Sequence, residues 1–259
     1  MSAAGFAYGL TVAYDGTAYH GWQRQPAVPT VAGRLEEALA AVTGEPVGVS
    51  GAGRTDAGAH ARGQVARVRL GRSWDPAALR AACNRVLPAD VRVTEVVRVG
   101  DDFDPRRDAW RRTYRYLVRP AGRGEPVGRM YWWELPYPLE LAPMRAAARL
   151  MLGRHDFAAF GSSPREGGST VRLLDRADVE AVRGGLRLEF RADAFLRGMV
   201  RSMAGGLVAV GAGRLSPGAL RGLLERPSPR AASPLAAPAR GLHLWQVEYR
   251  GPVQEGVAA

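Results

Sequence analysis

The sequence contains no lysine and only one cysteine, Cys83. Without lysine, the chain can form neither a Schiff base nor the lysine contact to phosphate that a P-loop makes. One cysteine excludes an internal disulfide and a metal cage of thiolates, which fits a reducing compartment. All 36 basic residues are arginines, and they exceed the 25 acidic residues to give a net charge of +11. A GC-rich genome would explain arginine in place of lysine but not this surplus. We therefore expect a polyanionic partner, RNA or DNA ahead of a membrane surface.

Long apolar runs are also missing. The best candidate, residues 205–213, is short and interrupted by glycines, so no membrane-spanning helix is expected. The N-terminal stretch has no basic region before its apolar residues and does not resemble a signal peptide. We therefore expect a soluble, cytoplasmic protein without a membrane partner. Its 259 residues allow one large or two modest domains.

Hydrophobic periodicity predicts nearly the same order of elements twice. In the first half, strands are expected at 6–14, 46–50, 64–70 and 91–97, and helices at 30–43 and 75–88. In the second half, strands are expected at 111–118, 170–182, 186–192 and 242–250, and helices at 139–152, 194–209 and 216–225. The order β-α-β-β-α-β is typical of the ferredoxin-like, or split βαβ, fold. We therefore predict an α+β protein of two ferredoxin-like halves, residues 1–105 and 106–259, whose sheets lie side by side with a cleft between them.

The most informative segment is the glycine-flanked loop at 51–60 (GAGRTDAGAH), between two predicted strands. A dinucleotide-binding loop would need glycine in place of Asp56 and a helix after it. A calcium site would need several oxygens, and Asp56 is the only carboxylate between Glu45 and Asp75. What remains is an aspartate close to Arg54, whose positive charge favours the ionised form and so suits a nucleophile or general base. An aspartate that merely closes a turn through its own backbone would show the same local pattern.

Six blocks of the sequence are distinctive when they are taken together. They are 14–25 (YDGTAYHGWQRQ), 53–61 (GRTDAGAHA), 112–116 (RTYRY), 153–160 (GRHDFAAF), 195–201 (FLRGMVR) and 241–244 (GLHL). In this order, and over nearly the whole chain, they resemble the blocks of the TruA family of tRNA pseudouridine synthases, and residues 53–61 resemble that family's signature loop.

The resemblance implies that Asp56 is the catalytic residue. It also implies that Tyr114 stacks on the target uridine, that Arg201 pairs with the catalytic carboxylate, and that Arg54 helps to fill the space left by the extruded base. The implied activity is isomerisation of uridine to pseudouridine at positions 38 to 40 in the anticodon stem-loop of tRNA, by a homodimer. Further candidate tRNA contacts are Arg24, Arg106, Arg107 and Arg165.

The isomerisation gains no group and changes no oxidation state, so we expect neither a cofactor nor a metal. Whether Asp56 attacks C1′, adds to C6 of the base or removes the 2′ proton stays open. Two other functions also stay open. One is an RNA-binding module without catalysis. The other is a metal-dependent nuclease, which the charge suggests but for which the loop lacks clustered carboxylates.

Several of these residues have ordinary structural interpretations as well. Tyr116, two residues from Tyr114 on the same strand, is expected in the core. Arg197 and Arg201, four residues apart on the predicted helix 194–209, could be a solvated pair. The four histidines are scattered without ligand spacing, so packing or RNA contact is favoured over metal binding.

Overall fold

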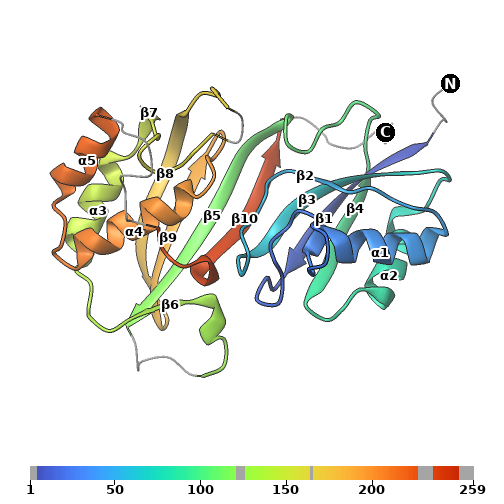
Figure 1. The fold of residues 1–259 in the computed structure, drawn as a ribbon, viewed down its shortest axis with the longest axis horizontal. Helices are drawn as coiled ribbons and strands as arrows, with labels where there is room; N and C mark the ends of the chain where they lie inside the picture. Colours follow the sequence, from blue (N-terminus) through green and yellow to red (C-terminus); the bar gives the residue numbers. More distant parts are fainter. Residues whose placement is uncertain (1–4, 121–125, 164–165, 227–235, 251–259) are drawn as a thin grey trace, which may run out of the picture. The chain divides into compact units, whose positions relative to one another are not determined.

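A computed structural model of the protein describes residues 5–120, 126–163, 166–226 and 236–250. It has a mixed α/β fold (Figure 1). Its chain divides into two units. Unit 1 comprises Met1–Trp110 and Leu244–Ala259, and unit 2 comprises Arg111–His243. Most of the last strand, β10 (Leu242–Tyr249), thus belongs to unit 1, where it pairs with a strand from the N-terminal part of the chain.

Unit 1 contains the elements that hydrophobic periodicity predicts, in the predicted order. They are β1 (Phe6–Tyr14), α1 (Val31–Thr43), β2 (Ser50–Gly51), β3 (His60–Leu70), α2 (Pro76–Val86) and β4 (Val91–Arg98). The sheet has the order β4-β1-β3-β10, with β2 also paired to β3. The pairs β1–β3, β1–β4 and β2–β3 are antiparallel. The strand predicted at 46–50 is in fact only two residues long, Ser50–Gly51, and overlaps the predicted range at residue 50 alone.

Local chemistry explains where the helices of unit 1 begin. Thr30 has an extended backbone, and its side chain accepts a hydrogen bond from the Gly33 amide, which caps α1. Asp75 caps α2 in the same way, and Pro76 occupies the first turn. The two helices pack together, and α2 packs on β4.

The core of unit 1 follows from alternation along its strands. One face of β1 and β3 is buried, and its members oppose one another in register, as Tyr8 opposes Val68 and Leu10 opposes Ala66. This burial fixes the register, because a slip by one residue would turn every apolar side chain to the other face. One polar residue, Gln64, stands on this buried face.

The strands of unit 2 follow the order β5-β9-β8-β7, with β6 parallel to β5. Its elements are β5 (Ala109–Pro120), η1 (Arg129–Tyr131), β6 (Trp133–Leu135), α3 (Leu141–Leu150), β7 (Gly153–Asp156), β8 (Val171–Val182), β9 (Gly185–Ala192), α4 (Met199–Gly211), α5 (Pro217–Glu225) and η3 (Ala239–Gly241). Strands β6 and β7 were not predicted, because three or four residues are too few to show alternation. Its helices α3, α4 and α5 pack together, and α3 also packs on β8.

The start of α4 differs from the prediction. The helix begins at Met199, five residues later than expected, because Gly198 adopts a left-handed backbone (φ 75°) that interrupts it. Arg197 is extended and exchanges two backbone hydrogen bonds with Ser162. Arg197 and Arg201 therefore do not share a helix face, so the alternative interpretation as a pair on one helix face loses its basis.

A network of ion pairs joins strands of unit 2. Glu189 on β9 accepts hydrogen bonds from Arg115 on β5 (2.6 Å) and from Arg176 on β8 (2.7 Å). Burial alone would raise the pKa of Glu189, but these two guanidinium groups hold the pKa below its usual range. The ionised carboxylate therefore stabilises the folded state.

Among the described residues, no helix is long and apolar enough to cross a membrane.

Candidate active site

The loop between β2 and β3 carries Asp56 and lies against the segment that follows β1. The amide of Trp22 donates a hydrogen bond to the Thr55 carbonyl (3.2 Å), and the amide of Gly58 donates to the Tyr19 carbonyl (3.2 Å). The turn itself is closed by the Ala59 amide, which donates to the Asp56 carbonyl (3.1 Å). Two blocks that stand apart in the sequence, 14–25 and 53–61, thus form one structure within unit 1.

Two glycines make this close contact possible. A Cβ atom at Gly16 would overlap the carbonyl of Ala59. Gly21 has φ +90° and leaves room for the Thr55 carbonyl, which would lie 2.5 Å from a Cβ at that position. Any larger residue would push the loop away, so these glycines are required by the contact with the Asp56 loop.

Side chains anchor the loop at three further points. The hydroxyls of Tyr14 and Thr55 share a hydrogen bond of 2.8 Å. The amide nitrogen of the Gln64 side chain donates to the Gly53 carbonyl at 2.7 Å. The Gly16 amide donates to Nδ1 of His60 at 3.0 Å. The four anchoring side chains, Tyr14, Thr55, His60 and Gln64, are all buried.

His60 has a second neighbour at the same nitrogen. Oδ1 of Asp15 lies 3.1 Å from Nδ1, and this oxygen also accepts hydrogen bonds from the amide and the hydroxyl of Thr17. A neutral imidazole with an unprotonated Nδ1 accepts from Gly16, whereas an imidazolium would donate to Asp15. In either form, His60 links the end of the loop to the turn after β1.

The loop presents its charged residues differently from its anchors. Arg54 is exposed and Asp56 is half-buried, whereas Thr55 between them is buried. A short rigid loop therefore holds one carboxylate at a position that solvent reaches. A carboxylate of this kind can accept or donate a proton, or attack an electrophilic carbon.

Tyr114 lies on β5 of unit 2, opposite Phe190 on β9. The residue is 7% exposed, and its ring meets the ring of Phe195 edge to face, with centroids 4.9 Å apart. Tyr116 is fully buried, as predicted for a core residue, and its hydroxyl donates to the Pro238 carbonyl at 2.6 Å. Burial raises the pKa of Tyr116, so this phenol stays neutral.

Arg201 lies in the first turn of α4, in unit 2. Its Nε donates to the carbonyl of Ala237 at 2.6 Å, and its own carbonyl accepts from the Ala237 amide at 3.1 Å. The side chain is held by these contacts and is half-buried, so Arg201 is not a freely solvated surface cation. The expected pairing of Arg201 with Asp56, which lies in unit 1, stays a prediction.

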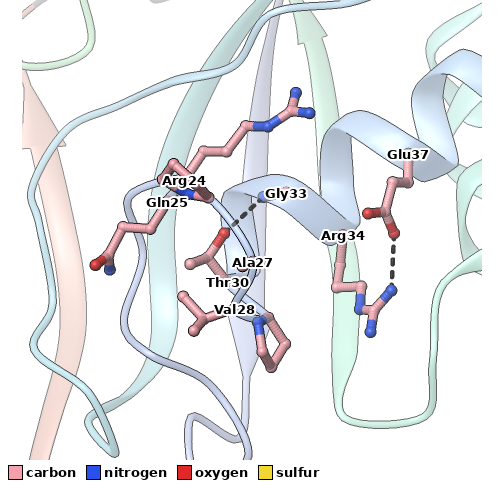
Figure 2. Close-up of a pocket in the computed structure, with 10 residues that line it drawn as sticks. Arg24, Gln25, Ala27, Val28, Thr30, Gly33, Arg34 and Glu37 are labelled. Carbon is pink, nitrogen blue, oxygen red and sulfur yellow. Dashed lines mark hydrogen bonds and ion pairs between the residues drawn. The ribbon is translucent and has the colours of Figure 1, made fainter.

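The candidate tRNA contacts of unit 1 lie on exposed segments. Arg24 pairs with Glu36 at 2.7 Å and lines an open hollow of about 780 Å³ at the start of α1. Figure 2 shows this hollow, with Arg34 beside it paired to Glu37. Arg24 is still 69% exposed in its side chain despite the ion pair.

Arg106 and Arg107 belong to a turn that Asp104 organises. Both backbone amides donate to Oδ1 of Asp104 at 2.8 Å, and the Arg107 guanidinium pairs with Asp108. The amide of Arg107, with that of Arg106, lowers the pKa of Asp104. Arg165 lies outside the described residues.

Sequence reasoning missed the anchoring roles of Tyr14 and Gln64. Tyr14 stands in a block that resembles the family, but no role was assigned to it. Gln64 carried a local signal, because a polar residue on the buried face of an alternating strand requires a partner. The partner itself could not be inferred from the sequence.

Among the described residues, no three His, Cys, Asp or Glu side chains gather into a group that could hold a metal ion.

The fold and the loop define a class of protein, an α/β scaffold that presents one carboxylate on a rigidly anchored loop. Comparison with known proteins identifies the family. The family model of tRNA pseudouridine synthase matches residues 10–107 and 147–250. The chain belongs to this family, which confirms the resemblance inferred from the six blocks.

Individual relatives agree over nearly their whole length. The tRNA pseudouridine synthase A of Methylobacterium sp. (strain 4-46) is 43% identical over 246 residues, which cover 95% of this chain and 98% of the relative. The protein of the same name from Sinorhizobium medicae (strain WSM419) is 44% identical, and the match covers 93% of this chain and 98% of the relative. The protein of the same name from Methylacidiphilum infernorum (isolate V4) is 42% identical, and the match covers 96% of this chain and 98% of the relative.

Proposed function

We propose that this protein isomerises uridine to pseudouridine in tRNA, at positions 38 to 40 of the anticodon stem-loop, and that Asp56 is its catalytic carboxylate. The observation that carries the proposal is the anchored loop. Hydrogen bonds at Gly53 and Thr55 hold one flank of Asp56 and a hydrogen bond at His60 holds the other, while Asp56 itself is half-buried. An aspartate with only a turn-forming role would not need a loop fixed at so many points.

The proposed reaction breaks the bond between N1 and C1′, turns the freed uracil, and joins C5 to C1′. C5 loses its proton and N1 gains one, so substrate and product are isomers and no oxidant or group donor is consumed. Asp56 supplies the ionised oxygen, whether it attacks C1′, adds to C6 or removes the 2′ proton. The target nucleotide must first leave its helical stack, which costs a few kcal/mol.

Other residues have proposed roles in holding the substrate. Tyr114 would stack on the target base through the face of its aromatic ring. Arg201 would pair with the catalytic carboxylate, and Arg54 would fill the space left by the base.

The proposal extends to fold, assembly and location. The order β4-β1-β3-β2 with antiparallel neighbours in unit 1 supports a ferredoxin-like half, and we propose two such halves, 1–105 and 106–259. The net charge of +11 supports binding to a polyanion such as tRNA, with contacts from Arg24, Arg106 and Arg107. We also propose a homodimer that acts in the cytoplasm, and sedimentation of the purified protein would measure the assembly state.

The test is an Asp56→Asn variant assayed with tRNA that carries tritium at C5 of uridine. Formation of pseudouridine releases this tritium, so release should vanish in the variant while tRNA binding survives. A control, Asp178→Asn, changes an exposed carboxylate paired with Arg176 and should release tritium normally. Persistent release by Asp56→Asn would refute the role of Asp56. An RNA-binding module would release none even as wild type, and a nuclease would cut the tRNA and stop when EDTA is added.

A further inference from the structure

We infer that Tyr14 is a positioning residue for Asp56 and acts through Thr55. The inference rests on the proposed function, because it assumes that the Asp56 carboxylate must be held in place for the isomerisation. The contact that carries it is the hydrogen bond of 2.8 Å between the two hydroxyls, 41 residues apart in the sequence.

Thr55 is fixed on two sides by the same block of sequence. Its hydroxyl binds Tyr14, and its carbonyl accepts from the amide of Trp22. Thr55 is 6% exposed and immediately precedes the half-buried Asp56. Any displacement of Thr55 therefore moves the carboxylate.

Tyr14 is itself held rigidly. It ends β1, where it pairs with Ala61 on β3, and it is 5% exposed. Its ring packs against Trp22 with centroids 5.9 Å apart. The hydroxyl thus has a fixed position, and its hydrogen bond fixes the position of Thr55 in the loop.

Removing the Tyr14 hydroxyl has a specific consequence for the loop. The buried Thr55 hydroxyl loses the hydrogen bond to Tyr14 in a site from which water is largely excluded, so the loop shifts until this hydroxyl finds another partner. A displacement of about 1 Å at a catalytic group can cost about 100-fold in rate. Substrate binding through phosphate contacts elsewhere would be little changed.

The experiment compares Tyr14→Phe with Tyr8→Phe. Tyr8 lies on the same strand, is fully buried, and its hydroxyl also has backbone partners, donating to the Trp74 carbonyl at 3.0 Å and accepting from the Trp74 amide at 2.7 Å. Both variants lose one buried hydroxyl, but only Tyr14 contacts the Asp56 loop. We expect kcat to fall about 10- to 100-fold in Tyr14→Phe, with KM and tRNA affinity unchanged, and kcat per folded molecule to be unchanged in Tyr8→Phe.

Variants of Thr55 provide an independent arm should Tyr14→Phe fold poorly. Thr55→Val keeps the shape but loses the hydroxyl, and it should reproduce the loss of kcat seen in Tyr14→Phe. Thr55→Ser retains the hydroxyl and should restore most of the rate. The double variant Tyr14→Phe with Thr55→Val should be no slower than the slower single variant, because both remove the same bond.

Asp56→Asn, measured in parallel, separates this inference from the function on which it rests. Wild-type kcat in Tyr14→Phe or Thr55→Val, beside an inactive Asp56→Asn, would overturn the positioning role and leave the proposed function standing. Equal losses in Tyr14→Phe and Tyr8→Phe would also overturn it, because they would indicate a general effect on folding. An active Asp56→Asn would overturn the proposed catalytic residue instead.

Discussion

The glycine at position 21 gives a sharp prediction about how the loop and the catalytic rate are connected. Gly21 has φ +90°, and a Cβ atom there would lie 2.5 Å from the carbonyl oxygen of Thr55. Gly44, at the end of α1, has a similar φ of +77°, but no atom of the described residues lies within 4 Å of a Cβ built there. The two positions therefore share the backbone strain and differ in the clash.

The structure allows the two substitutions to be compared in free energy of unfolding. An alanine in the left-handed region costs about 1–2 kcal/mol, which is the full expectation for Gly44→Ala. Gly21→Ala adds the overlap with Thr55, and overpacking of this kind costs about 1–3 kcal/mol. We therefore expect Gly21→Ala to lose about 2–5 kcal/mol in total.

The decisive difference lies in activity. The overlap in Gly21→Ala is relieved by moving Thr55, so kcat per folded molecule should fall about 100-fold if the carboxylate moves by about 1 Å. Gly44→Ala should keep its kcat. Urea unfolding followed by circular dichroism gives the folded fraction, and tritium release from tRNA gives the rate for each variant. Equal rates per folded molecule in the two variants would refute the idea that the Gly21 contact positions the loop.

Three further predictions concern the second anchor, acid stability and tRNA binding. Gln64→Met keeps the size of the side chain but removes the donor to the Gly53 carbonyl, so unfolding in urea should show a loss of about 1 kcal/mol together with a lower kcat. Because the pKa of Glu189 is lowered in the folded state, its contribution to stability is present above its unfolded pKa of about 4.3 and is lost as the pH falls through the folded value. Glu189→Gln should therefore be less stable than wild type at pH 7, and the difference should shrink in acid, as thermal unfolding at several pH values would show; a constant difference would contradict this assignment. If Arg106 contacts a phosphate, Arg106→Ala should lower the slope of log affinity against log salt concentration by about 1, and filter binding at several salt concentrations measures that slope.

Much of unit 1 could be predicted because its signals are local. The cap at Thr30 and the pair Asp75 and Pro76 mark helix starts, and alternation marks β1, β3 and β4. Such signals act within a few residues and are visible in the chain itself. The same reasoning failed at the start of α4. The apolar stripe continues upstream of Gly198, but the backbone at Gly198 is left-handed and therefore not helical.

Long-range pairing could not be predicted from local pattern. The sequence identifies the last strand, 242–250, but nothing in it shows that β10 pairs with β3 of unit 1. In the site, too, some features can be predicted from the sequence and others depend on long-range contacts. Family resemblance selects Asp56, whereas its anchors depend on contacts such as that between Tyr14 and Thr55, which only the folded chain brings together.

The most direct test of the account maps pseudouridine in tRNA from cells that lack this protein. Pseudouridine should be missing at positions 38 to 40 and present elsewhere. Wild-type protein supplied to these cells should restore it, and Asp56→Asn should not. Unchanged pseudouridine at these positions, or its restoration by Asp56→Asn, would contradict the account.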